Sequence, residues 1–374
     1  MSRMAKSDPS EILEPRENTY FTGHDAAESA FLNAWSGGRL AHAWLICGPR
    51  GIGKATLAYR IARFVLSQEQ NAEATSDMFG APPALSLQMS AEHPVFRRIA
   101  SQGHGDFRAI ERGWSDAKQT KRKTVITVDD VRGIGSFMTM TPSEGGWRVV
   151  LIDATDEMNT NAANAVLKVL EEPPKQAILL LLAHNPDRLL PTIKSRCRRL
   201  DLRPLQTDQV AALLNRYRPD LSPEDTRPLA VLSDGSIGRA LELEEEGGVD
   251  LFRDLIALLS TAPQIDTSLM HAVSDRALRG DVFWTITGLL SWWLARHTIE
   301  AARGGLTDLE EVIPGERKLA EKLIGLAPPI AWAETWQYLG RISERTLAVH
   351  LDRKRSLLLI LNAIQQAALG RSAA

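Results

Sequence analysis

Three short stretches of the chain are apolar at almost every position. They run from Ala43 to Cys47, from Arg148 to Asp153 and from Ala177 to Ala183. Continuous rather than alternating apolar residues are typical of strands buried on both faces of a parallel sheet. The second stretch ends in the carboxylate of Asp153, which is predicted to lie at the carboxyl end of its strand.

Helical periodicity connects the second and third strands. Residues 161–172 are helix-forming throughout, with Ala165, Val166, Val169 and Leu170 on one face, and two prolines follow. A second helix, residues 57–66, follows the first strand. Strand, helix and strand in this order predict a parallel sheet covered by helices on both faces.

The second half of the chain has only helical patterns. Helices are expected at residues 210–217 and 225–232, and throughout the region from residue 249 onward. Apolar stripes there include Trp332, Trp336 and Leu339. Such stripes are typical of a core, whereas outward-facing tryptophans would suit an interface, and the sequence does not separate the two.

Composition limits the class of protein. The 374 residues suffice for two or three domains, and 44 basic against 46 acidic residues give no net field for binding a polyanion. The two cysteines, Cys47 and Cys197, lack metal-ligand spacing and fit a reducing compartment. With no long apolar run and a charged amino terminus, a cytoplasmic protein without membrane contact is expected.

A phosphate-binding loop follows the first strand. The residues from Gly48 to Lys54 include Gly51 and Gly53, whose flexible backbone would let the amides point at phosphate oxygens. Lys54 would reach the outer phosphates. In a strand, loop and helix context, this pattern predicts a nucleotide site.

The loop lacks one element of the usual motif. A Ser or Thr directly after the lysine would ligate magnesium, but this chain has Ala55 there. Thr56 is one residue late, and a step of one helical residue turns a side chain by about 100°. Thr56 is a candidate nucleotide-binding residue, yet it should not replace the missing hydroxyl, so magnesium binding is expected to be impaired.

A second element is missing after the second strand. Asp153 could hold magnesium through water. An ATPase with such a loop and strand keeps a catalytic glutamate at the next position, but this chain has Ala154 there. Asp156 and Glu157 are expected to start the following helix, where acidic side chains favour the helix dipole. Both defects predict a site that binds nucleotide but hydrolyses it weakly or not at all.

Several further motifs keep a characteristic order: Gly23-His24, His42-Ala43-Trp44, residues 164–174 (Asn-Ala-Val-Leu-Lys-Val-Leu-Glu-Glu-Pro-Pro), Ser195-Arg196-Cys197, and Gly235-Ser236 with Arg239. Together with the phosphate loop, they make the chain similar to the delta-prime subunits of the bacterial DNA polymerase III clamp loader, members of the AAA+ superfamily. The motifs span roughly residues 16 to 245.

This resemblance implies a domain order. An α/β AAA+ core with a parallel sheet would occupy residues 17–203, after a flexible tail at 1–16. A small helical lid at 204–247 and an all-α collar for oligomerisation at 248–374 would follow. Related chains often carry a four-cysteine zinc module, but the corresponding insertion here, residues 67–95, contains no cysteine, so no zinc is expected.

The resemblance also implies roles for three residues. Arg196 would be an arginine finger that acts in trans on the ATP of a neighbouring subunit, a role that suits a permanently charged, planar guanidinium. Asn185 resembles the first sensor of the family and Arg239 the second. Bound ATP or ADP is therefore expected to contact the phosphate loop, Asp153, Asn185 and Arg239.

The implied function is that of a non-hydrolysing clamp-loader subunit in DNA replication. It would assemble with delta and gamma/tau subunits into a pentamer that loads the sliding clamp on primed DNA, with no polymerase site of its own. The alternative is an active ATPase, either a gamma/tau-like subunit or a related AAA+ motor, which Ala55 and Ala154 disfavour. A P-loop kinase is a third alternative, but it has no use for the Ser-Arg-Cys and Leu-Glu-Glu-Pro-Pro segments.

Overall fold

The computed structural model describes residues 14–68, 86–113, 123–143, 146–305 and 309–371. Most of the predicted tail and residues 69–85 of the predicted insertion lie outside this part. Contacts divide the chain into two compact units. Unit 1 comprises residues 1–209 and 236–238, and unit 2 comprises residues 210–235 and 239–374.

Unit 1 contains a five-stranded sheet in the order β2-β3-β4-β1-β5. All four strand pairs are parallel. The strands are β1 (Ala43–Cys47), β2 (Phe107–Ile110), β3 (Arg148–Ile152), β4 (Ala177–Ala183) and β5 (Arg198–Asp201). The predicted parallel sheet is confirmed, and its first and third expected strands have the predicted bounds.

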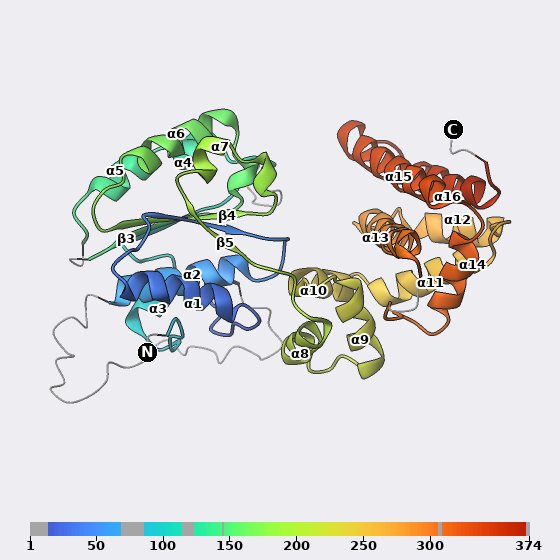
Figure 1. Cartoon of the computed structure of the whole chain (residues 1–374), viewed down its shortest axis with the longest axis horizontal. Coiled ribbons are helices and arrows are strands. Elements are labelled where there is room, and N and C mark those ends of the chain that lie inside the picture. The colour runs from blue at the N-terminus through green and yellow to red at the C-terminus, as the bar shows by residue number, and fades with distance from the viewer. Residues whose placement is uncertain (1–13, 69–85, 114–122, 144–145, 306–308, 372–374) are drawn as a thin grey trace. The chain divides into compact units, whose positions relative to one another are not determined.

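Helices cover both faces of this sheet (Figure 1). One face carries α1 (Asp25–Ser36), α2 (Lys54–Ser67) and α3 (Pro94–Ala100). The other carries α4 (Val128–Val131), α5 (Ile134–Thr139), α6 (Thr160–Glu171) and α7 (Pro191–Lys194). Two short 3-10 turns, η2 (Thr155–Glu157) and η3 (Pro186–Arg188), follow β3 and β4.

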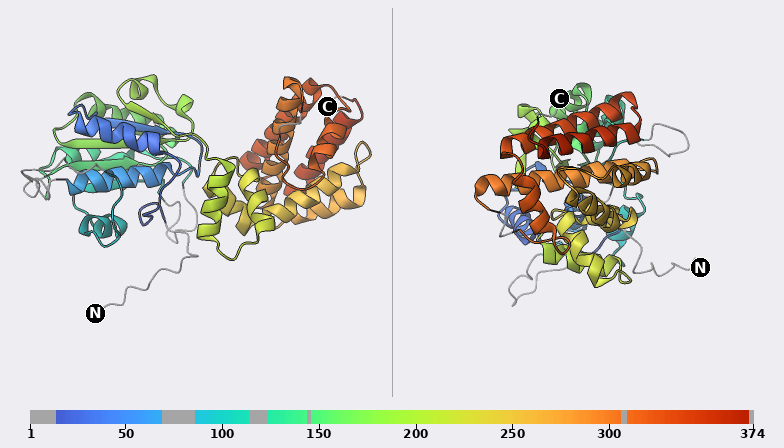
Figure 2. Two further views of the ribbon diagram at one scale, coloured as in Figure 1. Left: turned by 60° about the horizontal axis from the view of Figure 1, so that its bottom comes forward. Right: turned by 90° about the vertical axis from the view of Figure 1, so that its right-hand side faces the viewer.

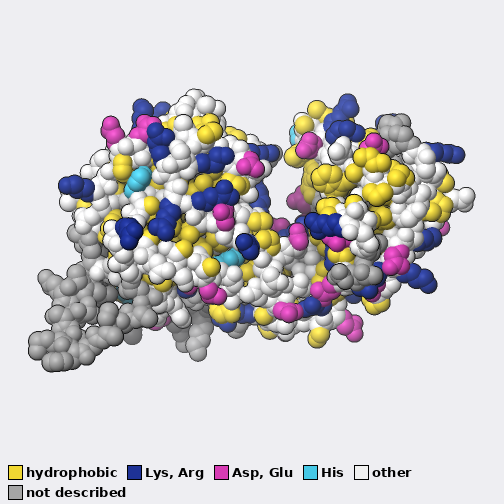
Figure 3. All heavy atoms as spheres, viewed as in Figure 1, with side chains coloured by type: hydrophobic (Ala, Val, Ile, Leu, Met, Phe, Trp, Pro, Cys, Tyr) yellow, Lys and Arg dark blue, Asp and Glu magenta, His cyan; other side chains and the backbone are white. Residues whose placement is uncertain are grey.

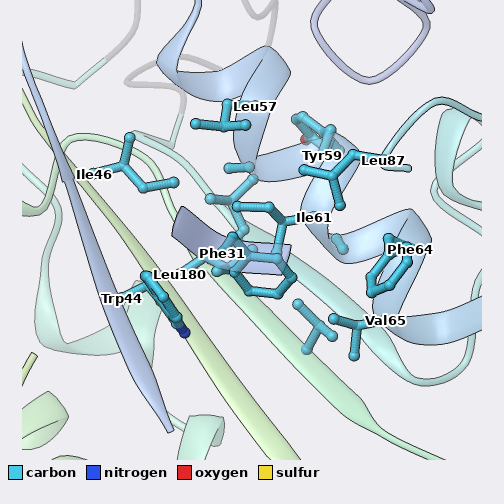
Figure 4. Packing of buried hydrophobic residues seen from close by; sticks show 14 of the residues in the cluster. Phe31, Trp44, Ile46, Leu57, Tyr59, Ile61, Phe64, Val65, Leu87 and Leu180 are labelled. Atoms are coloured by element: carbon cyan, nitrogen blue, oxygen red, sulfur yellow. The ribbon is translucent and has the colours of Figure 1, made fainter. Parts of the chain in front are cut away.

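The alternation of side chains along each strand divides the core into two layers. In β1, Trp44 and Ile46 pack with Phe31, Leu57 and the neighbouring residues of α1 and α2. Figure 4 shows this cluster from close by. The intervening residues of β1 pack with α5 and α6 on the opposite face. Because both faces are buried, every position of β1 must be apolar, as the sequence pattern predicted.

A buried ion pair lies at the start of β3. The guanidinium of Arg148 is 3.2 Å from Oδ1 of Asp106, and the two side chains are 6% and 2% exposed. Asp106 also accepts hydrogen bonds from the backbone and hydroxyl of Ser143 at 2.9 and 2.8 Å. Since a charge at this depth requires partners, the pair fixes the loop before β3 to the residue that precedes β2.

Two arginines of α2 hold the segment before α1. Arg63 is fully buried and donates to the carbonyls of Asn18, at 3.0 Å, and of Arg16. Arg60 donates to the Thr19 carbonyl at 3.0 Å and pairs with Glu28 at 2.7 Å. The backbone from residue 16 to 19 is therefore fixed to α2.

Unit 2 is helical in its described residues. Its helices are α8 (Thr207–Tyr217), α9 (Pro223–Leu232), α10 (Ile237–Glu245), α11 (Gly248–Ser260), α12 (Thr267–Arg276), α13 (Val282–Arg303), α14 (Glu316–Ile324), α15 (Pro329–Val349) and α16 (Arg353–Ala368), where α8 and α10 each have a few residues in unit 1. Helix α15 packs against α13 and α16 (Figure 2). The predicted helical second half is thus confirmed.

The apolar stripe of α15 is partly core and partly exposed surface, the two alternatives that the sequence left open. Trp332 and Leu339 are buried, at 0% and 3% exposure, but Trp336 is 42% exposed. Trp336 therefore does not belong to the core, and its indole Nε1 donates to the hydroxyl of Ser291 at 2.8 Å.

The sequence pattern missed strands β2 and β5. Strand β2 is short, and β5 reads Arg-Arg-Leu-Asp, in which only Leu200 is buried. β5 is an edge strand, so it needs few apolar residues. Within the described residues, none of the helices combines the length and apolarity that crossing a membrane requires.

Candidate functional site

The loop after β1 has the backbone that a phosphate site requires. Gly48, Gly51 and Gly53 have φ values of 147°, 71° and 101°. Gly53 is the amino-terminal cap of the 14-residue helix α2. The positive φ at this cap turns the chain directly into the helix, so the first free amides of α2 face the concavity of the loop.

The segment 236–238 closes against the loop within unit 1. The Ser236 hydroxyl donates to the Arg50 carbonyl at 2.8 Å, and the Gly238 amide donates to the Gly51 carbonyl at 3.0 Å. A Cβ on Gly51 would lie 2.4 Å from the Ser236 Oγ and 2.9 Å from the Gly238 Cα. Gly51 is thus required by this contact as well as by its φ.

His24 supports the loop from the other side. Its Nε2–H donates to the Ile52 carbonyl at 2.7 Å, and the side chain is buried. Burial lowers the pKa of His24, which favours the neutral imidazole. The preceding Gly23 leaves room for Leu205, because a Cβ there would lie 2.3 Å from the Leu205 Cδ2. The Gly23-His24 motif therefore has a structural reason.

Lys54 lies inside the loop and contacts the loop's own backbone. Its ammonium donates to the Gly48 carbonyl at 2.7 Å and also to the Pro49 carbonyl. The residue is only 4% exposed, and burial lowers its pKa to about 8, partly offset by Asp153 and Asp156. A phosphate would supply the opposite charge that this buried ammonium lacks.

Asp153 follows β3 and is part of the same electrostatic cluster. Burial, followed by the nearby charge of Glu111, raises its pKa to about 6, whereas Lys54 acts in the opposite direction. The next residue, Ala154, has a left-handed backbone with φ of 65°. The carboxylate predicted to hold magnesium is thus at the end of β3, and the residue after it has no carboxylate.

The prediction that Asp156 and Glu157 start the following helix is wrong. Both lie in η2, and α6 begins at Thr160, capped by Asn159. The Asp156 carboxylate accepts hydrogen bonds from the backbone amides of His184 and Asn185 at 3.0 and 2.8 Å. These bonds tie the turn after β3 to the turn after β4.

Glu157 connects the phosphate loop to the end of β2. Its carboxylate pairs with Arg50 of the loop and with Arg112, the latter at 3.0 Å. The Arg50 side chain is 63% exposed, so its charge faces solvent as well as Glu157. The Glu157 carboxylate is therefore held between two guanidinium groups beside the loop.

The two residues after Lys54 differ in exposure. Ala55 is half-buried and has no atom that ligates a metal, whereas the Thr56 side chain is buried, at 8% exposure. The amides and the lysine of the loop suit a phosphate group, but the residues after Lys54 do not complete a magnesium site.

Asn185 lies at the end of β4, and its side chain has a local role. Its Oδ1 accepts a hydrogen bond from the Asp187 amide at 3.2 Å and caps η3. The adjacent His184 is close enough to the loop that Lys54 and Arg50 add to burial in lowering its pKa to about 4. The sensor role of Asn185 stays a prediction.

Arg196 lies between α7 and β5, with 37% of its side chain exposed. Its guanidinium donates to the Thr192 carbonyl at 3.1 Å and pairs with Glu171 at 3.1 Å. Glu171 ends α6 in the Leu-Glu-Glu-Pro-Pro segment. The structure thus brings together two of the motifs that the sequence analysis selected.

Arg239 belongs to unit 2 rather than to unit 1. It lies on α10 and lines a cavity with residues of α13 and α15. Burial lowers its pKa, opposed by Asp234 and Glu242. The other candidate residues, from Gly48 to Arg196, all belong to unit 1.

Sequence reasoning missed Glu111, Arg112 and His184. Each directly follows, or lies one residue beyond, the end of a parallel strand, and the carboxyl ends of parallel strands meet at one edge of the sheet. That rule could have placed His184 beside the loop. It could not have found Glu111 and Arg112, because β2 itself was not recognised.

Comparison with known proteins finds similarity to one kind of replication protein. A family model described as DNA polymerase III, delta subunit, matches residues 23–206. A DNA polymerase III subunit delta' from Pseudomonas aeruginosa is 39% identical over 219 residues, which are 57% of this chain. The Bacillus subtilis subunit delta' is 30% identical over 205 residues. In sequence, the chain is similar to DNA polymerase III delta-prime subunits.

The similarity extends to a second kind of subunit. The DNA polymerase III subunit tau of Bacillus subtilis is 26% identical over 314 residues, 84% of this chain. The chain spans only part of these relatives: 60% and 54% of the two delta-prime subunits and 49% of tau. The similarity to delta-prime subunits agrees with the predicted AAA+ core, whose sheet, phosphate loop and helical covering are all present.

Proposed function

We propose that this chain is a non-hydrolysing subunit of a bacterial DNA polymerase III clamp loader. In this role it assembles with delta and gamma/tau subunits in a pentamer, donates Arg196 to the ATP of a neighbour, and helps load the sliding clamp on primed DNA. A cytoplasmic location follows from this role in DNA replication.

The observation that carries the proposal is the pair of missing groups around a preserved phosphate loop. Ala55 has no hydroxyl for magnesium, and Ala154 has no carboxylate to orient water. Metal assistance and general-base assistance each contribute orders of magnitude in rate. A site without both is suited to holding nucleotide rather than to hydrolysing it.

The residues of the loop support binding of ATP or ADP. The amides at the start of α2 would hold the phosphates, and Lys54 would exchange the Gly48 and Pro49 carbonyls for a phosphate oxygen. Asp153 is the remaining carboxylate for a weakly held magnesium ion. Asn185 and Arg239 are the further candidates for contacts with nucleotide.

The surroundings of Arg196 support a role in trans. The guanidinium is partly exposed, lies beside an edge strand and contacts the rest of the chain through one carbonyl and one exposed carboxylate. A guanidinium stays charged at any physiological pH and can neutralise charge that develops on a transferred phosphate. Its contact with Glu171 is weak enough to be replaced.

An active ATPase, similar to gamma or tau, is the second candidate. The intact glycines and Lys54 favour it, as does the match to a tau subunit over 84% of this chain. Ala55 and Ala154 oppose it, because an active ATPase would need other groups in place of the missing hydroxyl and the missing carboxylate.

The test is ATP turnover by the purified chain, measured with and without delta and gamma/tau subunits. We expect the chain to co-purify with these partners and to retain nucleotide. By itself, the purified chain should hydrolyse ATP no faster than a control without protein. Brisk turnover by the isolated chain would exclude the non-hydrolysing role. Failure to co-purify would exclude membership of the complex.

A further inference from the structure

A cavity of about 500 Å³ lies within unit 2, away from the residues assigned above except Arg239. Its walls come from α10, α13 and α15, and its aromatic part consists of Trp284, Trp292 and Trp336. The volume is within the range of pockets that hold a small ligand or a few side chains. Three of the nine tryptophans of the chain therefore line this cavity.

The charges of the cavity favour a cation. Its lining has two carboxylates, Glu242 and Glu246, and one guanidinium, Arg239; Glu242 acts electrostatically on Arg239, so Glu246 supplies the excess negative charge. The carboxylate of Glu246 accepts a hydrogen bond from the hydroxyl of Thr285, and this bond holds the Glu246 side chain at the wall of the cavity. Indole faces attract ammonium and guanidinium groups. Trp292 already stacks with one such group, since the Arg296 guanidinium is 4.8 Å from its ring centre.

The floor of the cavity contains a glycine that packing does not explain. Gly288 lies within the 22-residue helix α13, and a Cβ added there would meet no atom within 4 Å. Glycine within a helix is unfavourable compared with alanine. The chain itself leaves the space above Gly288 open, so a group from outside the chain has room to approach the helix there.

The surroundings of the cavity favour a protein as the source of that group. Trp336 at its margin is 42% exposed, and further exposed apolar residues, Ile330, Leu347 and Leu359, lie on α15 and α16. Figure 3 shows hydrophobic side chains gathered over these two helices. A cavity lined by an exposed indole of α15 suits one inserted side chain within a larger contact on these helices.

We propose that this cavity binds an arginine or lysine side chain of a partner subunit, over Gly288 and between the three indoles. The identity of the partner as a clamp-loader subunit rests on the proposed function. The proposed chemistry of the cavity, an aromatic site that binds a cation, does not rest on the proposed function.

The first experiment tests the chemistry with the isolated full chain. N-acetyl-arginine amide and its neutral isostere N-acetyl-citrulline amide are compared by saturation-transfer NMR. We expect a signal for the arginine probe that is at least fivefold stronger than for the citrulline probe. The signal should be lost in Gly288→Leu, which fills the cavity, and reduced in Glu246→Gln.

Gly340→Leu is the matched control. Gly340 lies within α15, a Cβ there also meets no atom within 4 Å, and the residue does not line the cavity. Both variants replace a helical glycine by a better helix former, so the Tm of each should be unchanged or higher. Equal signals for the two probes, or a signal that survives in Gly288→Leu, would overturn the proposed chemistry.

The second experiment tests the partner. The affinity of the chain for delta and gamma/tau subunits is measured for the same two variants, and we expect Gly288→Leu to weaken assembly at least tenfold and Gly340→Leu to leave it unchanged. Normal assembly of Gly288→Leu would overturn the partner contact. If the unaltered chain does not assemble at all, the proposed function fails, while the probe experiment still decides the chemistry of the cavity.

Discussion

The guanidinium of Arg196 lies 3.1 Å from the carboxylate of Glu171, although 25 positions separate the two residues in the sequence. The pair joins the Ser-Arg-Cys segment to the Leu-Glu-Glu-Pro-Pro segment on the surface of unit 1. Both side chains are substantially exposed, at 37% and 50%. An ion pair of this kind contributes little to stability, so its role is better sought in the placement of Arg196.

Replacing Arg196 by alanine should slow ATP hydrolysis of the reconstituted complex. Loss of a guanidinium that stabilises the transition state in trans lowers the rate by about a thousandfold or more in related chemistry, and we expect at least about a tenfold decrease here. The Tm should not change, because Arg196 is exposed. The measurement is steady-state ATPase of the complex with and without the variant, and an unchanged rate would exclude the finger role.

Replacing Glu171 by glutamine should raise the ATPase rate of the complex, the opposite of the effect of Arg196→Ala. The carboxylate competes with a neighbour's phosphate for the guanidinium, so its removal should raise the ATPase rate of the complex by about two- to fivefold, equivalent to about 1 kcal/mol or less. Glu172→Gln is the matched control, because Glu172 is adjacent and exposed and forms no ion pair with Arg196. A decrease in rate for Glu171→Gln would instead indicate that Glu171 holds Arg196 in its active position.

Nucleotide affinity should fall as the pH rises through the pKa of Lys54. The pKa of this buried ammonium is lowered to about 8, and only its protonated form attracts a phosphate. Between pH 7.5 and 9, ADP affinity should therefore decrease by roughly five- to tenfold, whereas a lysine with an ordinary pKa would show almost no change. Titration of a fluorescent ADP analogue at several pH values measures this.

Lys54→Arg is the control for that pH dependence. A guanidinium does not lose its proton in this range, so the affinity of the variant should be nearly independent of pH, whatever its absolute value. A variant that retains the full pH dependence would assign it to another group.

Restoring the hydroxyl after Lys54 should restore magnesium dependence. In Ala55→Thr, a hydroxyl stands at the position that ligates the metal, so magnesium should strengthen ADP binding by about tenfold or more relative to its effect on the unaltered chain. Calorimetry with and without magnesium measures the difference. ATP hydrolysis should stay at background in this variant, since Ala154 still lacks a carboxylate, and appreciable turnover would show that Ala154 is not limiting.

Breaking the buried ion pair of unit 1 should destabilise the unit strongly. Asp106→Ala leaves the guanidinium of Arg148 buried without its carboxylate, and we expect a loss of about 3 to 5 kcal/mol in the free energy of unfolding. Asp129→Ala removes the partner of Arg132 in a pair that is more than 70% exposed on both sides, and should cost less than about 1 kcal/mol. Chemical denaturation of both variants makes the comparison, and similar losses would contradict this account.

Much of the fold could be predicted from the sequence because burial imposes a local pattern. The central strands β1, β3 and β4 are covered on both faces, so their residues are apolar at every position except Arg148, and α6 has an apolar stripe that two prolines follow. The edge strand β5 has one buried residue and gives no such pattern. Trp336 has the periodicity of a core residue, but the packing of α13 and α15 leaves it exposed.

The sequence by itself determined the chemistry that is present or missing at each motif: the glycines and Lys54 of the loop, the methyl groups of Ala55 and Ala154, and the charge of Arg196. These follow from residue type and order along the chain. Only the tertiary structure decided which groups meet, because parallel strands and their crossovers bring together residues that are far apart in sequence. Arg196 with Glu171 and Glu157 with Arg50 and Arg112 depend on that arrangement. In unit 2, Trp284, Gly288 and Trp292 share a face of α13 by their spacing of four, and only the packing of α15 on α13 brings Trp336 to them.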